Sequence, residues 1–155
     1  MKVILMLDHL LVPLDQSPLA EQALEYAREI IAPHGKITLV TVLDNLVVYR
    51  YGHEVHFPRD VEDNLIKKAE AYLSDLGNNL RRDGINVELL VRVGTPDRII
   101  CRVAISRNVN AIVMSTHGRG GFGRLIFGSV TRSVLEKSTC PVLVVPNQQK
   151  VSARV

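Results

Sequence analysis

The sequence has no tryptophan, only two cysteines, few aromatic residues and no long uninterrupted hydrophobic stretch. Cys101 and Cys140 belong to no CxxC pair and to no cysteine and histidine cluster of metal-ligand spacing, so a reduced, cytoplasmic chain is the simple interpretation. No segment reaches the ~18 apolar residues of a membrane span, and the apolar run over residues 1–7 is interrupted at Asp8 too early for a signal peptide. We therefore expect neither export nor membrane insertion.

Strong positive charge is also missing, since the formal net charge is only +3. The basic residues are scattered, except for Arg119, Arg124 and Arg132 and a short tail with Lys150 and Arg154. Nucleic-acid-binding proteins usually show a basic stripe interleaved with aromatic residues, or a known reading motif, and neither is present. The arginines beside the glycines fit a small phosphate ligand better, the alternative being surface residues that only aid solubility.

What the sequence does contain is a regular alternation of short β-branched runs and helical patterns, which predicts a mostly parallel sheet. At 155 residues one core is enough, so we expect a single domain over residues 1–155, with a core at about 9–146 and a flexible tail at 147–155. The predicted fold is a Rossmann-like, three-layer, doubly wound α/β sandwich whose five strands take the order 3-2-1-4-5.

The expected boundaries follow from turn and cap residues. Strands are predicted at 9–13, 36–43, 86–93, 111–115 and 141–145, and helices at 18–31, 61–80, 96–105 and 129–137. The first and third of these helices begin with the same signal, an N-cap (Ser17 or Thr95) followed by proline at the first helical position. The stretch from Asp44 to Pro58 is irregular and is interpreted as a flap or lid.

Glycines are concentrated in residues 117–128, between a predicted strand and a predicted helix. Backbone N–H groups and the positive end of a helix attract anions at such a position, so a phosphate site is the natural hypothesis, with an ordinary loop as the alternative. Gly118, Gly120 and Gly123 match GxGxxG, but a dinucleotide-binding fold places that motif after its first strand. In this chain the motif follows the fourth predicted strand, so we reject the dinucleotide-binding interpretation.

A P-loop is excluded for a different reason. Gly123 and Gly128-Ser129 have the required spacing, but the lysine that would reach the outer phosphates is absent. Arg119 and Arg124 could supply positive charge from the loop instead.

Four short motifs follow one another along the chain. They are Leu11-Val12-Pro13-Leu14-Asp15 with Ser17, Gly94-Thr95-Pro96, Met114-Ser115-Thr116-His117-Gly118 with nine residues to Gly128-Ser129, and Cys140-Pro141-Val142-Leu143-Val144-Val145. Together they resemble the universal stress protein family, from His9 to Pro146. The nucleotide-binding branch of that family carries G-x-x-G, nine residues, then G-[ST]. This chain matches every position except the first, where Ser115 replaces glycine.

The resemblance implies a site for ATP, or for AMP or ADP, at the carboxyl ends of the strands. Asp15 and Val42 would contact adenine or ribose, Pro13 would shape the base pocket, Met114, Ser115 and His117 would line the cleft, and Gly118, Arg119, Gly128, Ser129, Val130 and Thr131 would surround the phosphates. Plainer roles stay open: Asp15 as a helix cap, Val42 as core and Ser129 as an N-cap. Mg²⁺ or Mn²⁺ could accompany ATP, and Asp15, Ser129 or Thr131 could help to bind this cation.

The function implied is an ATP-binding switch in stress response or signalling, with a protein partner that the sequence does not name. The resemblance also implies a homodimer in which strands 141–145 of two copies pair antiparallel. No catalytic residue is predicted, because His117 has no identifiable nucleophile to activate, and hydrolysis of ATP would be weak at most. Two alternatives remain: a slow ATPase or adenylyl-transferring enzyme, and a dimeric scaffold without nucleotide, which Ser115 keeps open.

Overall fold

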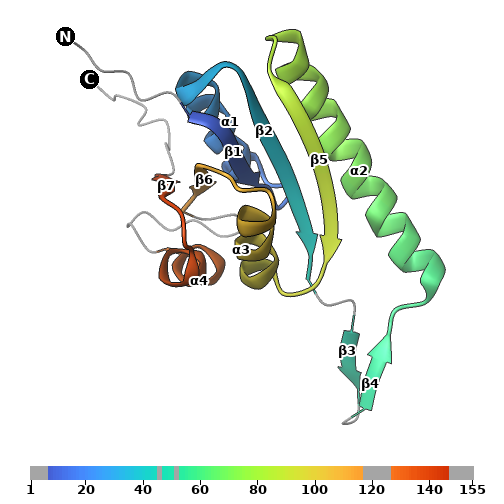
Figure 1. Cartoon of the computed structure of the whole chain (residues 1–155). Helices are drawn as coiled ribbons and strands as arrows, with labels where there is room; N and C mark the ends of the chain where they lie inside the picture. The colour runs from blue at the N-terminus through green and yellow to red at the C-terminus, as the bar shows by residue number, and fades with distance from the viewer. Residues whose placement is uncertain (1–6, 45–46, 51–52, 117–126, 147–155) are drawn as a thin grey trace, which may run out of the picture.

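The computed structural model describes residues 7–44, 47–50, 53–116 and 127–146. At its centre is a parallel sheet of five strands in the order β5-β2-β1-β6-β7 (Figure 1). The strands are β1 (Leu7–Pro13), β2 (Ile31–Leu43), β5 (Asn86–Val93), β6 (Ala111–Ser115) and β7 (Val142–Val145). Counted along the chain without the short hairpin β3–β4, this is the order 3-2-1-4-5, so the predicted doubly wound α/β fold is confirmed.

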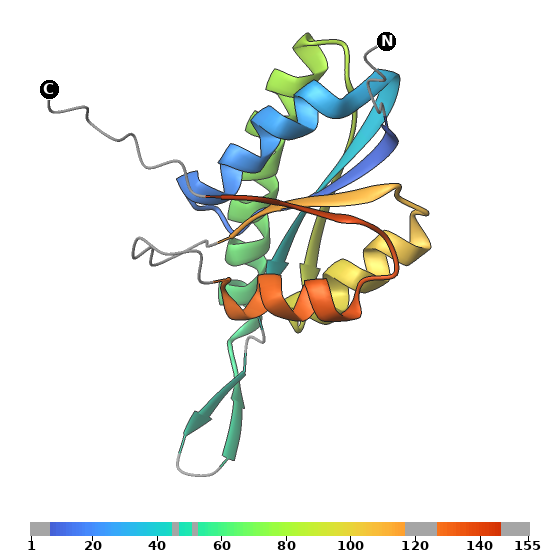
Figure 2. The ribbon, with the colours of Figure 1, turned by 90° about the vertical axis from the view of Figure 1, so that its left-hand side faces the viewer.

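Two helices cover each face of the sheet (Figure 2). One layer holds α1 (Pro18–Ile30) and α2 (Arg59–Arg82), and the other holds α3 (Pro96–Ser106) and α4 (Ser129–Lys137). Because both faces are covered, the central strands read as almost continuous apolar runs. The crossover helices thus lie on opposite faces on either side of β1, as a doubly wound sheet requires.

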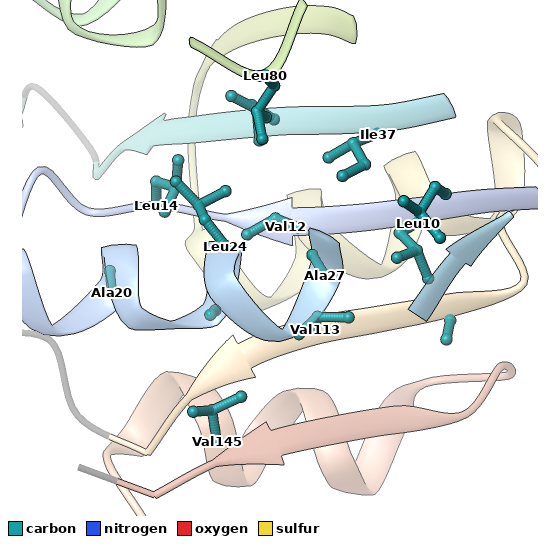
Figure 3. Close-up of a cluster of buried hydrophobic side chains, with 14 of the residues drawn as sticks. Leu10, Val12, Leu14, Ala20, Leu24, Ala27, Ile37, Leu80, Val113 and Val145 are labelled. Atoms are coloured by element: carbon teal, nitrogen blue, oxygen red, sulfur yellow. The ribbon is translucent and has the colours of Figure 1, made fainter. Parts of the chain in front are cut away.

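Helix α1 packs closely on the sheet because its inner face alternates alanine with leucine. Ala20, Ala23 and Ala27 are buried together with Leu24 against β1 and β6 (Figure 3). Small side chains allow the helix to approach the strands, and Leu24 fills the space between them. As a result, α1 covers the boundary between β1 and β6 from one side.

The predicted cap of α1 is confirmed in detail. Ser17 accepts a hydrogen bond from the backbone N–H of Ala20 at 3.1 Å, and Pro18 is the first helical residue. Thr95 stands at the N-cap of α3 without a side-chain hydrogen bond to the helix.

The end of α1 differs from the prediction, which continued the helix through Ile31. The structure ends the helix at Ile30, and Ile31 opens β2 by pairing with Leu7. Pro33 disfavours the helical conformation at the residue before it, so the chain leaves the helix early. The side chain of Ile31 is buried in the core instead.

The stretch predicted to be irregular, from Asp44 to Pro58, contains an antiparallel hairpin. Its strands β3 (Val47–Arg50) and β4 (His53–His56) project from the carboxyl end of β2, away from the helix layers (Figure 1). A two-residue connection with glycine is a typical hairpin signal, but strands of four residues are too short to show a clear period. The predicted role as a flap or lid stays a prediction.

Strand β2 buries two threonines whose hydroxyl groups have different surroundings. The hydroxyl of Thr38 donates to Glu88 Oε2 at 3.2 Å and lies 2.8 Å from His9 Nε2. Glu88 also binds Lys36 and Arg107, and their hydrogen bonds outweigh burial and lower its pKa. The hydroxyl of Thr41, on a residue only 1% exposed, has no hydrogen-bond partner within the described part of the chain.

Replacing Thr41 with valine is therefore expected to raise the free energy of unfolding by about 1 kcal/mol, because it removes an unsatisfied buried polar atom at constant shape. Chemical denaturation would measure the change. Thr38→Val is the matched control, and it should lower stability since it leaves His9 and Glu88 without their shared hydroxyl. A Thr41→Val protein less stable than wild type would contradict this assignment.

Candidate functional site

A cleft opens where the direction of strand addition reverses. From β1 the chain proceeds outward to β2, and it later returns to place β6 on the other side of β1. Strands β1 and β6 pair at two positions, the last being Leu11↔Ile112, although β1 continues to Pro13 and β6 to Ser115. Such a reversal is where doubly wound sheets bind ligands, outside the carboxyl ends of the strands.

The cleft has a volume of ≈ 280 Å³, just below the ~300–1,000 Å³ typical of small-ligand sites. Its lining residues are Pro13, Leu14, Asp15, Ala20, Val40, Val42, Pro96, Ile100, Met114, Ser115, Thr116, Gly128, Ser129, Val130 and Thr131. Apolar side chains from β2, β6 and α3 form the inner part, and the start of α4 supplies polar groups.

The structure brings together nine of the twelve residues that the sequence predicted for the site. They are Pro13, Asp15, Val42, Met114, Ser115, Gly128, Ser129, Val130 and Thr131. His117, Gly118 and Arg119 lie outside the described residues. The sequence did not predict the contribution of α3, namely Pro96 and Ile100. Period-two alternation from Val42 would have indicated Val40, which lies on the same face of β2.

The start of α4 presents backbone N–H groups to the cleft. Its N-cap is Gly128, and no side chain in the described part of the chain caps the helix. The first hydrogen bond along the helix runs from Arg132 N–H to Gly128 O at 3.0 Å, so the N–H groups of residues 129–131 have no intrahelical partner. A helix end of this kind carries a partial positive charge and favours an anion.

Nothing in the described chain requires glycine at position 128. Its φ of −60° suits any residue, and an added Cβ would lie 3.4 Å from the Thr116 carbonyl oxygen, an ordinary contact. Gly128 N–H donates to the same oxygen at 2.9 Å and fixes the approach to α4. Among the described residues, apart from the two chain neighbours, no other atom lies within 4 Å of the added Cβ.

The two hydroxyl residues of the first turn of α4 are not equivalent. Thr131 is 4% exposed, and its hydroxyl donates to the Ser115 carbonyl oxygen at 3.1 Å, which joins α4 to the end of β6. Ser129 is exposed at the helix start. The hydroxyl available to a ligand as a donor is thus that of Ser129, whereas Thr131 holds the helix in place.

Asp15 stands at the mouth of the cleft as an exposed residue. Its Oδ1 accepts a hydrogen bond from Ser17 N–H at 3.1 Å, in the turn that leads into α1. The adjacent Gln16 has a φ of 64°, the left-handed backbone conformation found in tight turns. Asp15 therefore combines a local turn contact with a place at the cleft.

Other chemistries find little support among the described residues. No group of three or more His, Cys, Asp and Glu side chains in that part of the chain could hold a metal ion. Burial and the nearby Asp97 carboxylate raise the pKa of the Cys101 thiol, which disfavours the reactive thiolate. In the described part, no helix combines the length and apolar character needed to cross a membrane.

Comparison with known proteins identifies the family. The sequence model of the universal stress protein family matches residues 6–146, most of the chain. The chain belongs to the universal stress protein family. Among curated relatives, universal stress protein Sll1654 of Synechocystis sp. is 31% identical over 146 residues, covering 92% of this chain and 88% of the relative.

A second universal stress protein, MJ0577 of Methanocaldococcus jannaschii, is similar in both sequence and structure. It is 32% identical over 89 residues, and this match covers 57% of the chain and 55% of the relative's length. Its solved structure superposes with a TM-score of 0.77 and 25% identity, covering 95% of this chain and 99% of that one. The likeness confirms the fold over nearly the whole chain.

Two further universal stress protein structures contain nucleotides. One is a complex with cAMP, at 20% identity, a TM-score of 0.64 and coverage of 91% of this chain and 98% of that one. The other, from Arabidopsis thaliana, has AMP bound, at 19% identity, a TM-score of 0.62 and coverage of 90% of this chain and 91% of that one. At these identities the likeness shows a shared fold.

Proposed function

We propose that this chain acts as one universal stress protein domain that binds ATP and serves as a nucleotide-dependent switch in stress response or signalling. The main support for this proposal is the start of α4. Its N-cap is Gly128, which offers no side chain to the free N–H groups, and it lines an apolar cleft at the reversal of strand order. An adenine nucleotide has the matching halves, an apolar base and an anionic phosphate chain. Relatives of the same fold with AMP or cAMP bound support the proposal.

In this proposal the inner part of the cleft receives the base. Val40, Val42 and Met114 form apolar walls from two strands, and Pro13 closes the end of β1. The exposed carboxylate of Asp15 can accept a hydrogen bond from a ribose hydroxyl, as its place at the mouth suggests.

The phosphates would lie at the start of α4, where the N–H groups of residues 129–131 and the Ser129 hydroxyl are donors. Gly118 and Arg119 are proposed to contribute from the loop, and His117 to line the cleft. The nucleotide brings its own cation, Mg²⁺ or Mn²⁺. One carboxylate, Asp15, and one hydroxyl, Ser129, fit a cation held mainly by phosphates and water, which is the usual arrangement for Mg²⁺.

The proposed assembly is a homodimer formed through β7. This strand has β6 on one side, and its other edge is open within the described chain. Leu143 on this strand is 39% exposed. An open apolar edge is a template for antiparallel pairing, and a second copy satisfies it symmetrically.

The switch is proposed to act on a protein partner in the cytoplasm, the compartment in which free thiols such as Cys101 and Cys140 stay reduced. Neither nucleic acid nor membrane is part of the proposal. No described residue is proposed as a catalytic base, so binding rather than turnover is the expected activity.

Calorimetric titration of the purified protein with ATP and Mg²⁺ tests the proposal. We expect a dissociation constant on the order of micromolar, which corresponds to about −8 kcal/mol. Adenosine and inorganic triphosphate are the matched probes, because each fills one half of the cleft and should bind more weakly than ATP. Failure of the folded protein to bind ATP would refute the nucleotide switch and favour the scaffold, and rapid phosphate release would favour the ATPase.

A further inference from the structure

Two helices that are distant in the sequence, α3 and α4, contribute residues to the lining of the cleft. Pro96 and Ile100 come from α3, and residues 128–131 begin α4. Strand β6 and the segment after it lie between the two helices in the chain. Both helices pack on the same face of the sheet through Ile100, Val103 and Val134, and side-chain contacts between the two helices add to this packing.

A single buried carboxylate makes the polar contacts between these helices. Asp97 Oδ2 accepts hydrogen bonds from Ser133 Oγ at 2.6 Å and from Lys137 Nζ at 2.5 Å. Asp97 is only 9% exposed, although aspartate is seldom buried unless it is paired. The bonds from Lys137 and Ser133 outweigh its burial and hold the pKa of the Asp97 carboxyl down to about 2, so the residue stays ionised at neutral pH.

Both donors lie on α4 beyond the turn that faces the cleft. Ser133 follows Ser129 by four residues and Lys137 follows Ser133 by four, so all three lie along one side of the helix. A contact that fixes Ser133 therefore also fixes Ser129. Charge-assisted hydrogen bonds of this length are roughly twice as strong as neutral ones, which suits them to hold a helix in register.

We infer that Asp97 is a positioning residue for the proposed nucleotide site. By bonding Ser133 and Lys137 it holds the first turn of α4 against α3, so that the N–H groups of residues 129–131 remain directed at the phosphates. Thr131, bonded to the Ser115 carbonyl, fixes the same turn to the sheet from the other side. This inference rests on the proposed function for its ligand, but not for the contacts themselves.

The Asp97→Ala variant tests the role in binding. We expect its affinity for ATP to fall about tenfold, the order of effect seen when an outer contact that orients binding groups is lost. Lys137→Ala should cause a similar loss. The double variant should be no worse than Asp97→Ala, because both changes break one contact and their effects are then not additive.

Glu88→Ala is the matched control for stability. Glu88 likewise binds two cations, Lys36 and Arg107, but it belongs to β5 near the amino ends of the strands and does not line the cleft. Its loss should destabilise the fold and leave the ATP affinity within about twofold of wild type. An equal loss of affinity in Asp97→Ala and Glu88→Ala would overturn the positioning role.

Hydrogen exchange without nucleotide separates this inference from the proposed function. In Asp97→Ala the backbone amides of α4 should exchange faster, while those of β1 and β2 stay protected. If wild type does not bind ATP, the proposed function fails, and the exchange of α4 still decides whether Asp97 holds the helix. Unchanged exchange in α4, or unchanged affinity in a protein that binds ATP, would overturn the inference.

Discussion

Gly128→Asp is expected to reduce the affinity for ATP by at least about 100-fold, a loss of roughly 2.7 kcal/mol. The new carboxylate would occupy the N-cap of α4, where we propose that the phosphates bind, and it would repel them while satisfying the same N–H groups. Calorimetric titration with ATP and Mg²⁺ measures the loss.

The same substitution should leave the fold intact. The loss of ATP affinity would therefore not be caused by unfolding. The added Cβ lies 3.4 Å from the Thr116 carbonyl oxygen and the backbone φ of −60° suits aspartate. Aspartate is moreover a better N-cap than glycine by a few tenths of a kcal/mol. Thermal denaturation should therefore show a melting temperature equal to or above that of wild type, while binding is lost.

Gly128→Asn separates charge from size. Asparagine has nearly the same shape and caps a helix as well as aspartate, but it carries no charge. We expect an affinity between those of wild type and Gly128→Asp. If aspartate and asparagine weaken binding equally, the space above Gly128 matters and the charge does not. If neither weakens it, the phosphates bind elsewhere.

Val144→Pro is expected to disrupt the proposed homodimer, so that the variant is a monomer at a micromolar concentration at which the wild type is dimeric. Ile112 N–H donates to the Pro141 carbonyl, and Thr116 N–H donates to the Val145 carbonyl. In a parallel ladder the residues that bond the neighbour alternate, so the N–H of Val144 points away from β6 toward the open edge. Proline removes that donor and should break antiparallel pairing with a second copy.

Light scattering after size exclusion would measure the mass of each variant. Val144→Ala keeps the N–H and should remain dimeric, which controls for loss of the side chain. Retention of the parallel sheet in Val144→Pro should be visible by circular dichroism, because the ladder with β6 does not use this donor. A dimeric Val144→Pro protein would place the interface elsewhere.

Local patterns in the sequence predicted most of the fold. Helix α4 begins and ends where its pattern predicts, and Ser17 caps α1 as its position before proline indicates. These features depend on neighbouring residues, which a sequence displays directly. The strand order could also be predicted, because right-handed crossover connections allow only a few sheet topologies.

What the sequence did not predict depends on residues that meet only in three dimensions. Pro33 favours an early end of α1, but only the pairing with Leu7 across the sheet makes Ile31 the first residue of β2. Pro96 and Ile100 reach the cleft because α3 packs beside α4, and no spacing reveals that. Nine of the predicted site residues lie together around the cleft, and their roles in binding stay predictions until a ligand is measured.

Of the strand pairings in the central sheet, that of β1 with β6 has the fewest paired positions. Two paired positions join the half that contains β5, β2 and β1 to the half that contains β6 and β7, whereas β1 and β2 pair at six. Helix α1 contacts both β1 and β6 on one face and thereby connects the two halves of the sheet. A ligand bound in the cleft, at the carboxyl ends of β1 and β6, would join the two halves and stiffen the sheet without altering its shape, so that binding would change the rigidity of the domain.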